Sequence, residues 1–282
     1  MSERLKNTAV GIALGLALIA AFSLSPLPIG DDWEVFFEAG RRVLTGGSLY
    51  GEPIFKEFYY YNAPWLAVLI APFTLLPSRL GWSILSALTL ILTILVVRRW
   101  EKGLLKPVLA LVSPPMFYIL LHGQVDAIVL AGVMLPNLYW GLVALAKPQV
   151  TFGLIFGGKD TNGALNMIGA TAGIFLISLL LFGAWPLDLM RQPGPVGEHN
   201  IWLGLWPFQV PVGLGIAFFG MNRKDDRFYI AASPFFLPYA ATSSLLGVWI
   251  VMMSLLKNWQ SIIVLMAWWG VTIYRYFEAF PL

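Results

Sequence analysis

Long apolar runs separated by short polar segments dominate the chain. The first run covers residues 8–24, and nine more follow at 63–76, 80–97, 104–121, 125–135, 138–156, 164–185, 201–220, 228–253 and 260–277. A helix needs about 20 apolar residues to cross a bilayer, and several of these runs are shorter. The pattern therefore predicts an all-α, polytopic integral membrane protein with about 8–10 transmembrane or half-spanning helices.

Several runs contain prolines, which interrupt a helix because proline has no backbone N–H. These are Pro72, Pro114, Pro115, Pro136, Pro148, Pro207 and Pro234. Broken helices at membrane depth are tolerated where they are buried in protein or line a cavity, and in transport proteins they often lie at binding sites. Ordinary kinks are an equally common outcome.

Charged segments predict the topology. The basic start at residues 1–6 places the N-terminus in the cytoplasm, ahead of an uncleaved first helix. Residues 25–62 then form an external loop, and the basic clusters at 98–102 and 223–227 are predicted to be cytoplasmic. The number of crossings between residues 62 and 98 is left open. Either the segment 63–76 spans only half of the membrane, or Arg98 and Arg99 lie on the external side. We predict one integral membrane domain over residues 1–282, with a bundle at 63–282, in the cell membrane.

Composition narrows the function classes. The chain is 58% hydrophobic and 12% charged, against roughly 25% charged residues in a soluble domain. Soluble enzymes, disordered proteins and nucleic-acid binders are excluded, because a net charge of +3 spread over an apolar chain makes no phosphate-binding face. Cysteine is absent and histidine occurs only at His122 and His199, so no metal site is predicted.

The external loop contains an amphipathic sequence that begins near Asp31 and reaches Gly46 and Gly47. Its apolar face holds Trp33, Phe36, Phe37, Gly40, Val43 and Leu44, and its polar face holds Glu34, Glu38, Arg41, Arg42 and Thr45. This predicts a helix lying in the membrane interface. Asp31 and Glu34 fit a capping box with Asp31 as N-cap. Asp32 is not explained by the capping box. It is either a catalytic residue or a carboxylate that the helix dipole stabilises at the N-terminus.

An ordered set of motifs follows the first apolar run. It consists of Asp32 with Phe36, Phe37, Ala39, Gly46 and Tyr50, then the aromatic-to-proline stretch 58–64, then 122–126 (HGQVD), then 146–148 (AKP), and then Ser233-Pro234 with Tyr239. Over residues 1–160 this order resembles the GT-C glycosyltransferases, in particular the polyprenyl-phosphate-mannose-type enzymes of glycosyltransferase family 87. The chain is short for that family, and its second half is less similar.

The resemblance implies inverting transfer of a mannose-like sugar from a polyprenyl-phosphate donor to a lipid or glycan acceptor on the outer face. Asp32 is the expected general base, with Asp31 as the alternative. Lys147 is expected to neutralise the leaving phosphate, or else to snorkel from a helix end. The donor is a substrate, so no cofactor is implied.

Other candidates have a structural alternative of their own. His122, Gln124 and Asp126 could hold sugar hydroxyls or the phosphate, or simply begin a helix at the interface. Tyr60 and Tyr61 could stack on the sugar, or belong to an aromatic belt. His199 could add a second polar wall, although Asn200 as an N-cap explains that segment equally well.

Two functions of other classes stay open. The interrupted helices and Lys147 also suit a transporter or flippase of a lipid or small solute, although no inverted repeat supports it. The short chain also suits a non-catalytic subunit, derived from such a transferase, in a larger membrane complex.

Overall fold

The computed structural model describes residues 3–158, 161–194, 200–202 and 204–279. In these ranges the regular elements are all helical, so the predicted all-α class is confirmed there. The α-helices are α1 (Glu3–Leu24), α2 (Asp31–Thr45), α3 (Pro64–Ile70), α4 (Ser78–Trp100), α5 (Leu105–Leu111), α6 (Pro114–His122), α7 (Asp126–Ala131), α8 (Trp140–Ala146), α9 (Pro148–Thr151), α10 (Thr161–Phe182), α11 (Trp185–Arg191), α12 (Val210–Arg223), α13 (Asp226–Ala232), α14 (Leu246–Leu255) and α15 (Asn258–Ala279). Short 3-10 helices join them: η1 (Ala71–Leu75), η2 (Gly132–Met134), η3 (Asn137–Tyr139), η4 (Phe152–Phe156), η6 (Ser233–Phe236) and η7 (Thr242–Leu245).

Membrane-crossing capacity is concentrated in few helices. Within the described ranges, α4 and α10 are long and apolar enough to cross a membrane, and the α5–α6 pair, bent by 49°, is a third if it forms one span. α4 is largely enclosed by other helices, whereas α10 exposes apolar side chains such as Leu180, which is 86% exposed. The larger number of crossings predicted from the apolar runs stays a prediction.

Proline explains why the apolar runs give short helices. Pro114 starts α6 with Ser113 as N-cap, whose Oγ accepts a hydrogen bond from the Met116 backbone N–H. Pro148 likewise starts α9, and the break leaves Lys147 between two helices with a non-helical backbone. Because proline is tolerated at the first helical position, each break also begins the next helix.

Helix α2 is amphipathic as predicted, but its apolar face packs against protein. Trp33 and Ala39 are fully buried, and Phe36 is 4% exposed. The covering elements are α3 and η1, where the chain folds back after the external loop. The indole N–H of Trp33 also donates to the Ser78 carbonyl over 3.1 Å. The expectation of an apolar face turned to the membrane interface is therefore wrong for most of this helix.

The sequence predicted the C-terminal end of α2 correctly but not the cap at its N-terminal end. The helix begins at Asp31 with Gly30 as N-cap, and no side chain caps it, so the predicted capping box is wrong. Glu34 instead accepts a hydrogen bond from the Ser78 hydroxyl over 2.8 Å. At the other end, Gly46 adopts φ 74° and stops the helix as predicted.

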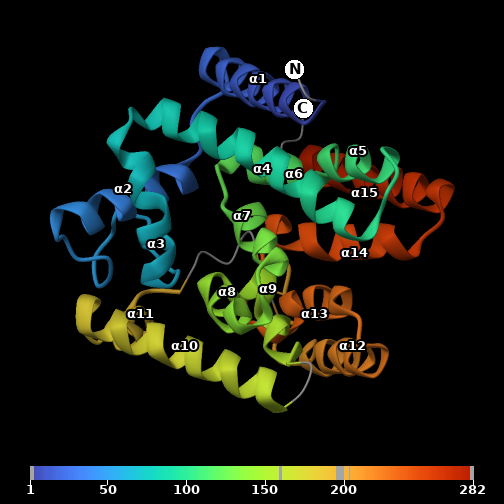
Figure 1. The fold of residues 1–282 in the computed structure, drawn as a ribbon. Coiled ribbons are helices and arrows are strands. Elements are labelled where there is room, and N and C mark those ends of the chain that lie inside the picture. Colours follow the sequence, from blue (N-terminus) through green and yellow to red (C-terminus); the bar gives the residue numbers. More distant parts are fainter. Residues whose placement is uncertain (1–2, 159–160, 195–199, 203, 280–282) are drawn as a thin grey trace.

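Helix α4 runs between two ends of the molecule, and its first and last residues contact different helices. Figure 1 shows α2 and α3 at one end, and α12 and α13 toward the other. Trp33 fixes α2 to Ser78 at the start of α4, whereas Arg99 at the end of α4 pairs with Asp226 at the start of α13 over 2.6 Å. With 23 residues, α4 is roughly 34 Å long.

Candidate functional site

A cavity of about 500 Å³ opens at the α2 end of the molecule. Its wall combines the start of α2, the chain around residues 57–62, the end of α6, the α8–α9 break and the segment 237–244. Of the residues singled out in the sequence, the structure brings Asp31, Asp32, Tyr61, His122, Gln124 and Lys147 to this wall.

Two glycines let α2 approach the end of α6. A Cβ on Gly30 would lie 2.3 Å from the backbone carbonyl carbon of His122. Gly123 ends α6 at φ 70°, and a Cβ there would lie 2.4 Å from the Trp33 Cβ. Since neither position has room for a side chain, the glycines bring Asp32 and Gln124 within bonding distance.

Asp32 projects from the first turn of α2 into the cavity. Its Oδ2 accepts a hydrogen bond from the Gln124 Nε2 over 2.6 Å and lies 4.0 Å from the His122 Nδ1. The side chain is 39% exposed because it faces the cavity. Burial by the surrounding walls raises the pKa of Asp32, and the positive charges of Lys147 and His122 only partly offset that effect.

A buried ion pair stands behind this contact. Lys147 Nζ donates to Asp126 Oδ2 over 2.5 Å, with side-chain exposures of 6% and 1%. The same ammonium group also donates to the Gln124 Oε1. Because the Gln124 carbonyl is held by Lys147, its amide NH₂ is oriented toward Asp32. Asp126, Lys147, Gln124 and Asp32 thus form one continuous polar chain.

Asp31 also lines the cavity but differs from Asp32 in its surroundings. Its side chain is 50% exposed, and its Oδ1 accepts a hydrogen bond from the Lys56 Nζ over 2.8 Å. This solvated ion pair suits a helix N-terminus. The geometry therefore favours Asp32 over Asp31 as the group that acts on a bound molecule.

The tyrosines at 59–61 divide between cavity and core. Tyr59 and Tyr61 line the cavity, and the Tyr61 hydroxyl donates to the Pro193 carbonyl over 2.7 Å. Tyr60 is fully buried, and its hydroxyl donates to the Ala63 carbonyl over 3.1 Å. The structure thus places Tyr60 in the core, in edge-to-face contact with Phe36, instead of at the cavity. His199 lies outside the described residues.

Tyr239, from the late Ser-Pro motif, also lines the cavity, together with residues that the sequence did not single out. One of these is Tyr118, whose ring lies 4.1 Å from that of His122. Ser243 and Ser244 line the wall with buried hydroxyls that have no protein partner among the described residues. The only sequence signal for this wall was the Ser-Pro motif before Tyr239.

The described residues include no group of three or more His, Asp or Glu side chains that could hold a metal ion. The polar groups of the cavity lining are carboxylates, amides, an imidazole, an ammonium group and hydroxyls. Such a set can accept a proton and hydrogen-bond a polyhydroxylated molecule.

No family model matches the chain, and the searches of curated proteins and of solved structures found no significant similarity either.

Proposed function

We propose that this protein is an inverting membrane glycosyltransferase. It moves a mannose-like sugar from a polyprenyl-phosphate donor to a lipid or glycan hydroxyl, with Asp32 as the general base. In this proposal the chain is a polytopic protein of the cell membrane with a cytoplasmic N-terminus, and the Asp32 cavity opens on the outer face. The charge distribution along the sequence and the ordered motifs support this assignment.

The observation that carries the proposal is the environment of Asp32. One carboxylate faces a cavity while a neutral amide, fixed by a buried ion pair, holds its Oδ2. Burial raises its pKa, which brings the group closer to the operating range of a general base. Asp31, in contrast, is held at the surface by an ion pair with Lys56.

The proposed transfer is a single displacement at the anomeric carbon of the donor sugar. The acceptor oxygen attacks the anomeric carbon and forms the new glycosidic bond, and its proton passes to the Asp32 carboxylate. The bond from the anomeric carbon to the phosphate oxygen breaks, and the electron pair leaves with the polyprenyl phosphate. In this proposal His122 is the basic side chain that stabilises that developing negative charge, because the charge of Lys147 is already matched by Asp126.

The rest of the wall suits the two parts of the donor. Tyr59, Tyr61 and Tyr118 offer ring faces and hydroxyls for a sugar, and Ser243 and Ser244 offer further hydroxyls. Phe36, Phe58 and Leu237 form an apolar part for the first isoprene units.

The test is transfer by the purified full-length protein from polyprenyl-phosphate mannose to an extracted lipid or glycan acceptor. Asp32→Asn keeps the shape and removes the base, so the rate should fall by about 100-fold or more. Asp188→Asn is the matched control, because Asp188 is paired with Arg191 outside the cavity lining and should keep the wild-type rate. Asp31→Asn then decides between the two neighbouring acids. A wild-type rate in Asp32→Asn would sink the proposal.

One observation favours a second candidate, translocation of a lipid or solute. Lys147, directly after α8, lines the Asp32 cavity, and Trp140 at the start of the same helix lines a second cavity. Cavities lined from the two ends of one short helix, next to the break at Pro148, fit a binding site that is reached alternately from two sides. Uptake of a polyprenyl-phosphate lipid into proteoliposomes, without formation of a glycosidic bond, would favour this function over transfer.

A further inference from the structure

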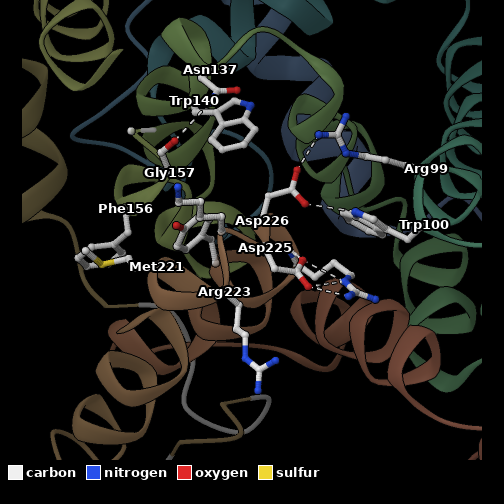
Figure 2. Close-up of a pocket in the computed structure, with 14 residues that line it drawn as sticks. Arg99, Trp100, Asn137, Trp140, Phe156, Gly157, Met221, Arg223, Asp225 and Asp226 are labelled. Carbon is white, nitrogen blue, oxygen red and sulfur yellow. Dashed lines mark hydrogen bonds and ion pairs between the residues drawn. The ribbon is translucent and has the colours of Figure 1, made fainter. Parts of the chain in front are cut away.

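A second and larger cavity, of about 1000 Å³, lies at the C-terminal end of α4. It is lined by the end of α4, the turn between α12 and α13, η3, the start of α8 and the chain after η4 (Figure 2). It shares no lining residue with the Asp32 cavity, so its ligand is a separate question from the proposed transfer reaction.

Positive charge exceeds negative charge on its wall. The lining contains the four cations Arg99, Arg223, Lys224 and Arg227 and the two carboxylates Asp225 and Asp226, an excess of two positive charges. Figure 2 shows Arg99 and Trp100 both directed at Asp226, and the distances are 2.6 Å from the guanidinium and 3.2 Å from the indole N–H.

The two carboxylates are both used by the protein. Asp225 accepts from the Arg227 guanidinium over 2.6 Å and also caps α13 by accepting from the Arg227 backbone N–H. Among the described residues, neither Arg223 nor Lys224 forms an ion pair with a carboxylate. These two side chains are exposed and supply the excess charge.

The backbone at Lys224 adds an independent observation. Lys224 adopts φ 54° directly after α12, and its N–H closes the helix by donating to the Met221 carbonyl over 3.3 Å. Glycine or asparagine usually fills such a position, because a Cβ is unfavourable in the left-handed region. A lysine held there costs stability, and such outliers concentrate at functional sites.

Apolar surface next to the cations indicates which anion fits. Trp140 and Phe156 line the cavity wall. The adjoining helix α12 exposes the apolar side chains of Val212, Leu214, Phe218, Phe219 and Met221. Arg223 lies over the Phe219 ring at 5.1 Å, so a cation stands at the edge of a surface suited to acyl chains. A free phosphate ion would make no use of this surface.

We propose that the cavity lined by Arg99, Arg223, Lys224 and Arg227 binds the phosphate headgroup of an anionic phospholipid, with its acyl chains along α12. Arg223 and Lys224 make the principal contacts with the phosphate. The predicted cytoplasmic position of both basic clusters fits, because anionic lipids are enriched in that leaflet and basic pockets between helices bind their headgroups.

The test uses the full-length protein in a neutral detergent, titrated with short-chain phosphatidylglycerol while the thermal unfolding midpoint is followed. A ligand that binds only the folded state raises this midpoint with concentration. Phosphatidylglycerol should raise it, and phosphatidylcholine of the same chain length and inorganic phosphate should raise it much less. Arg223→Gln and Lys224→Gly should each weaken the apparent affinity about fivefold, as expected for the loss of one interfacial cation.

Lys224→Gly removes the charge and relieves the backbone at the same time, so lost binding cannot be attributed to poor folding. Lys257→Gln is the matched control, since Lys257 is an exposed lysine outside the cavity lining. Unchanged affinity in both cavity variants would overturn the proposal. An equal midpoint shift with inorganic phosphate, or with phosphatidylcholine, would overturn the assignment to an anionic lipid.

Discussion

The two cavities use the same residue types in opposite ways. At the α2 end, Lys147 and Asp126 are almost fully enclosed and direct a neutral amide at one carboxylate. At the α12–α13 end, the pair of Arg99 and Asp226 keeps side-chain exposures of 37% and 21%, and further cations are left over beside it. One cavity therefore presents a carboxylate with a raised pKa, and the other presents net positive charge.

Burial accounts for the difference. A charge with little access to water is tolerated only with a partner, so the ammonium of Lys147 is matched by Asp126 and serves to orient its neighbours. Charges near the surface are solvated and can stay unmatched. Two exposed lysines at positive φ show that exposed charges can be matched or not: among the described residues other than glycine, Lys56 pairs with Asp31 and Lys224 has no carboxylate partner.

The largest expected change in stability comes from breaking the buried pair of Lys147 and Asp126. Lys147→Met leaves Asp126 charged and enclosed, and should lower the free energy of unfolding by about 3–5 kcal/mol. Arg99→Met removes one member of the more exposed pair and should cost about 1 kcal/mol or less. Denaturant unfolding in detergent measures both. Equal losses would show that the two pairs do not differ in the way their burial indicates.

A smaller effect concerns the pH dependence of the Asp32 cavity. The raised pKa of Asp32 places the acidic limb of the kcat/KM profile above the ordinary value of 3.8. The nearby His122 lowers this pKa, so His122→Gln should move the limb to higher pH. A limb that stays in place while kcat falls would assign His122 a role other than tuning the base.

The raised pKa of Asp32 also affects stability. Activity requires the deprotonated carboxylate and therefore rises with pH, whereas the contribution of Asp32 to stability falls with pH. The folded state binds the Asp32 proton more tightly than the unfolded state does. The resulting contribution to stability is complete below the unfolded pKa and is lost as the pH rises through the folded pKa. Asp32→Asn should therefore flatten the pH dependence of the unfolding free energy in that range.

The smallest expected effect is a gain. Lys224→Gly should raise the free energy of unfolding by about 0.5–1 kcal/mol without added lipid, because glycine accepts the left-handed conformation. Lys224→Ala is the comparison, since it removes the same charge but keeps the Cβ and should bring no such gain. A destabilised Lys224→Gly protein would indicate that the lysine side chain makes a stabilising contact at this turn.

The order of the motifs identified many of the residues that line the Asp32 cavity. These residues lie at helix breaks, and glycine and proline mark such breaks in the sequence. Gly123 ends one helix before Gln124, and Pro148 begins another after Lys147. Partner choice was not predictable, since the pairing of Asp126 with Lys147 depends on how separate helices pack. The core position of Tyr60 also depends on which neighbours enclose it.

The fold was predicted at the level of class. Apolar runs identify helices but not their environment, so the burial of α2 under α3 and η1 was missed. The same limit applies to Lys106, a buried lysine in an apolar run. Its Nζ donates to the Leu256 carbonyl and the Ser261 hydroxyl, both over 2.8 Å, and thereby caps the end of α14. Hydropathy alone cannot distinguish that capping role from a site residue.

Helix α8 has an electrical consequence if the two cavities open to opposite sides of a membrane. From Trp140 to Lys147 the chain advances only about 10 Å, against about 30 Å for the hydrocarbon core. Water in both cavities would then concentrate the membrane voltage across this thin layer, which ends at Lys147 beside Asp126 and Gln124. A charge displaced within this layer, as at the Lys147–Asp126 pair, would move in a field about threefold steeper than in a uniform bilayer, whereas a proton on Asp32, which faces the cavity, would not.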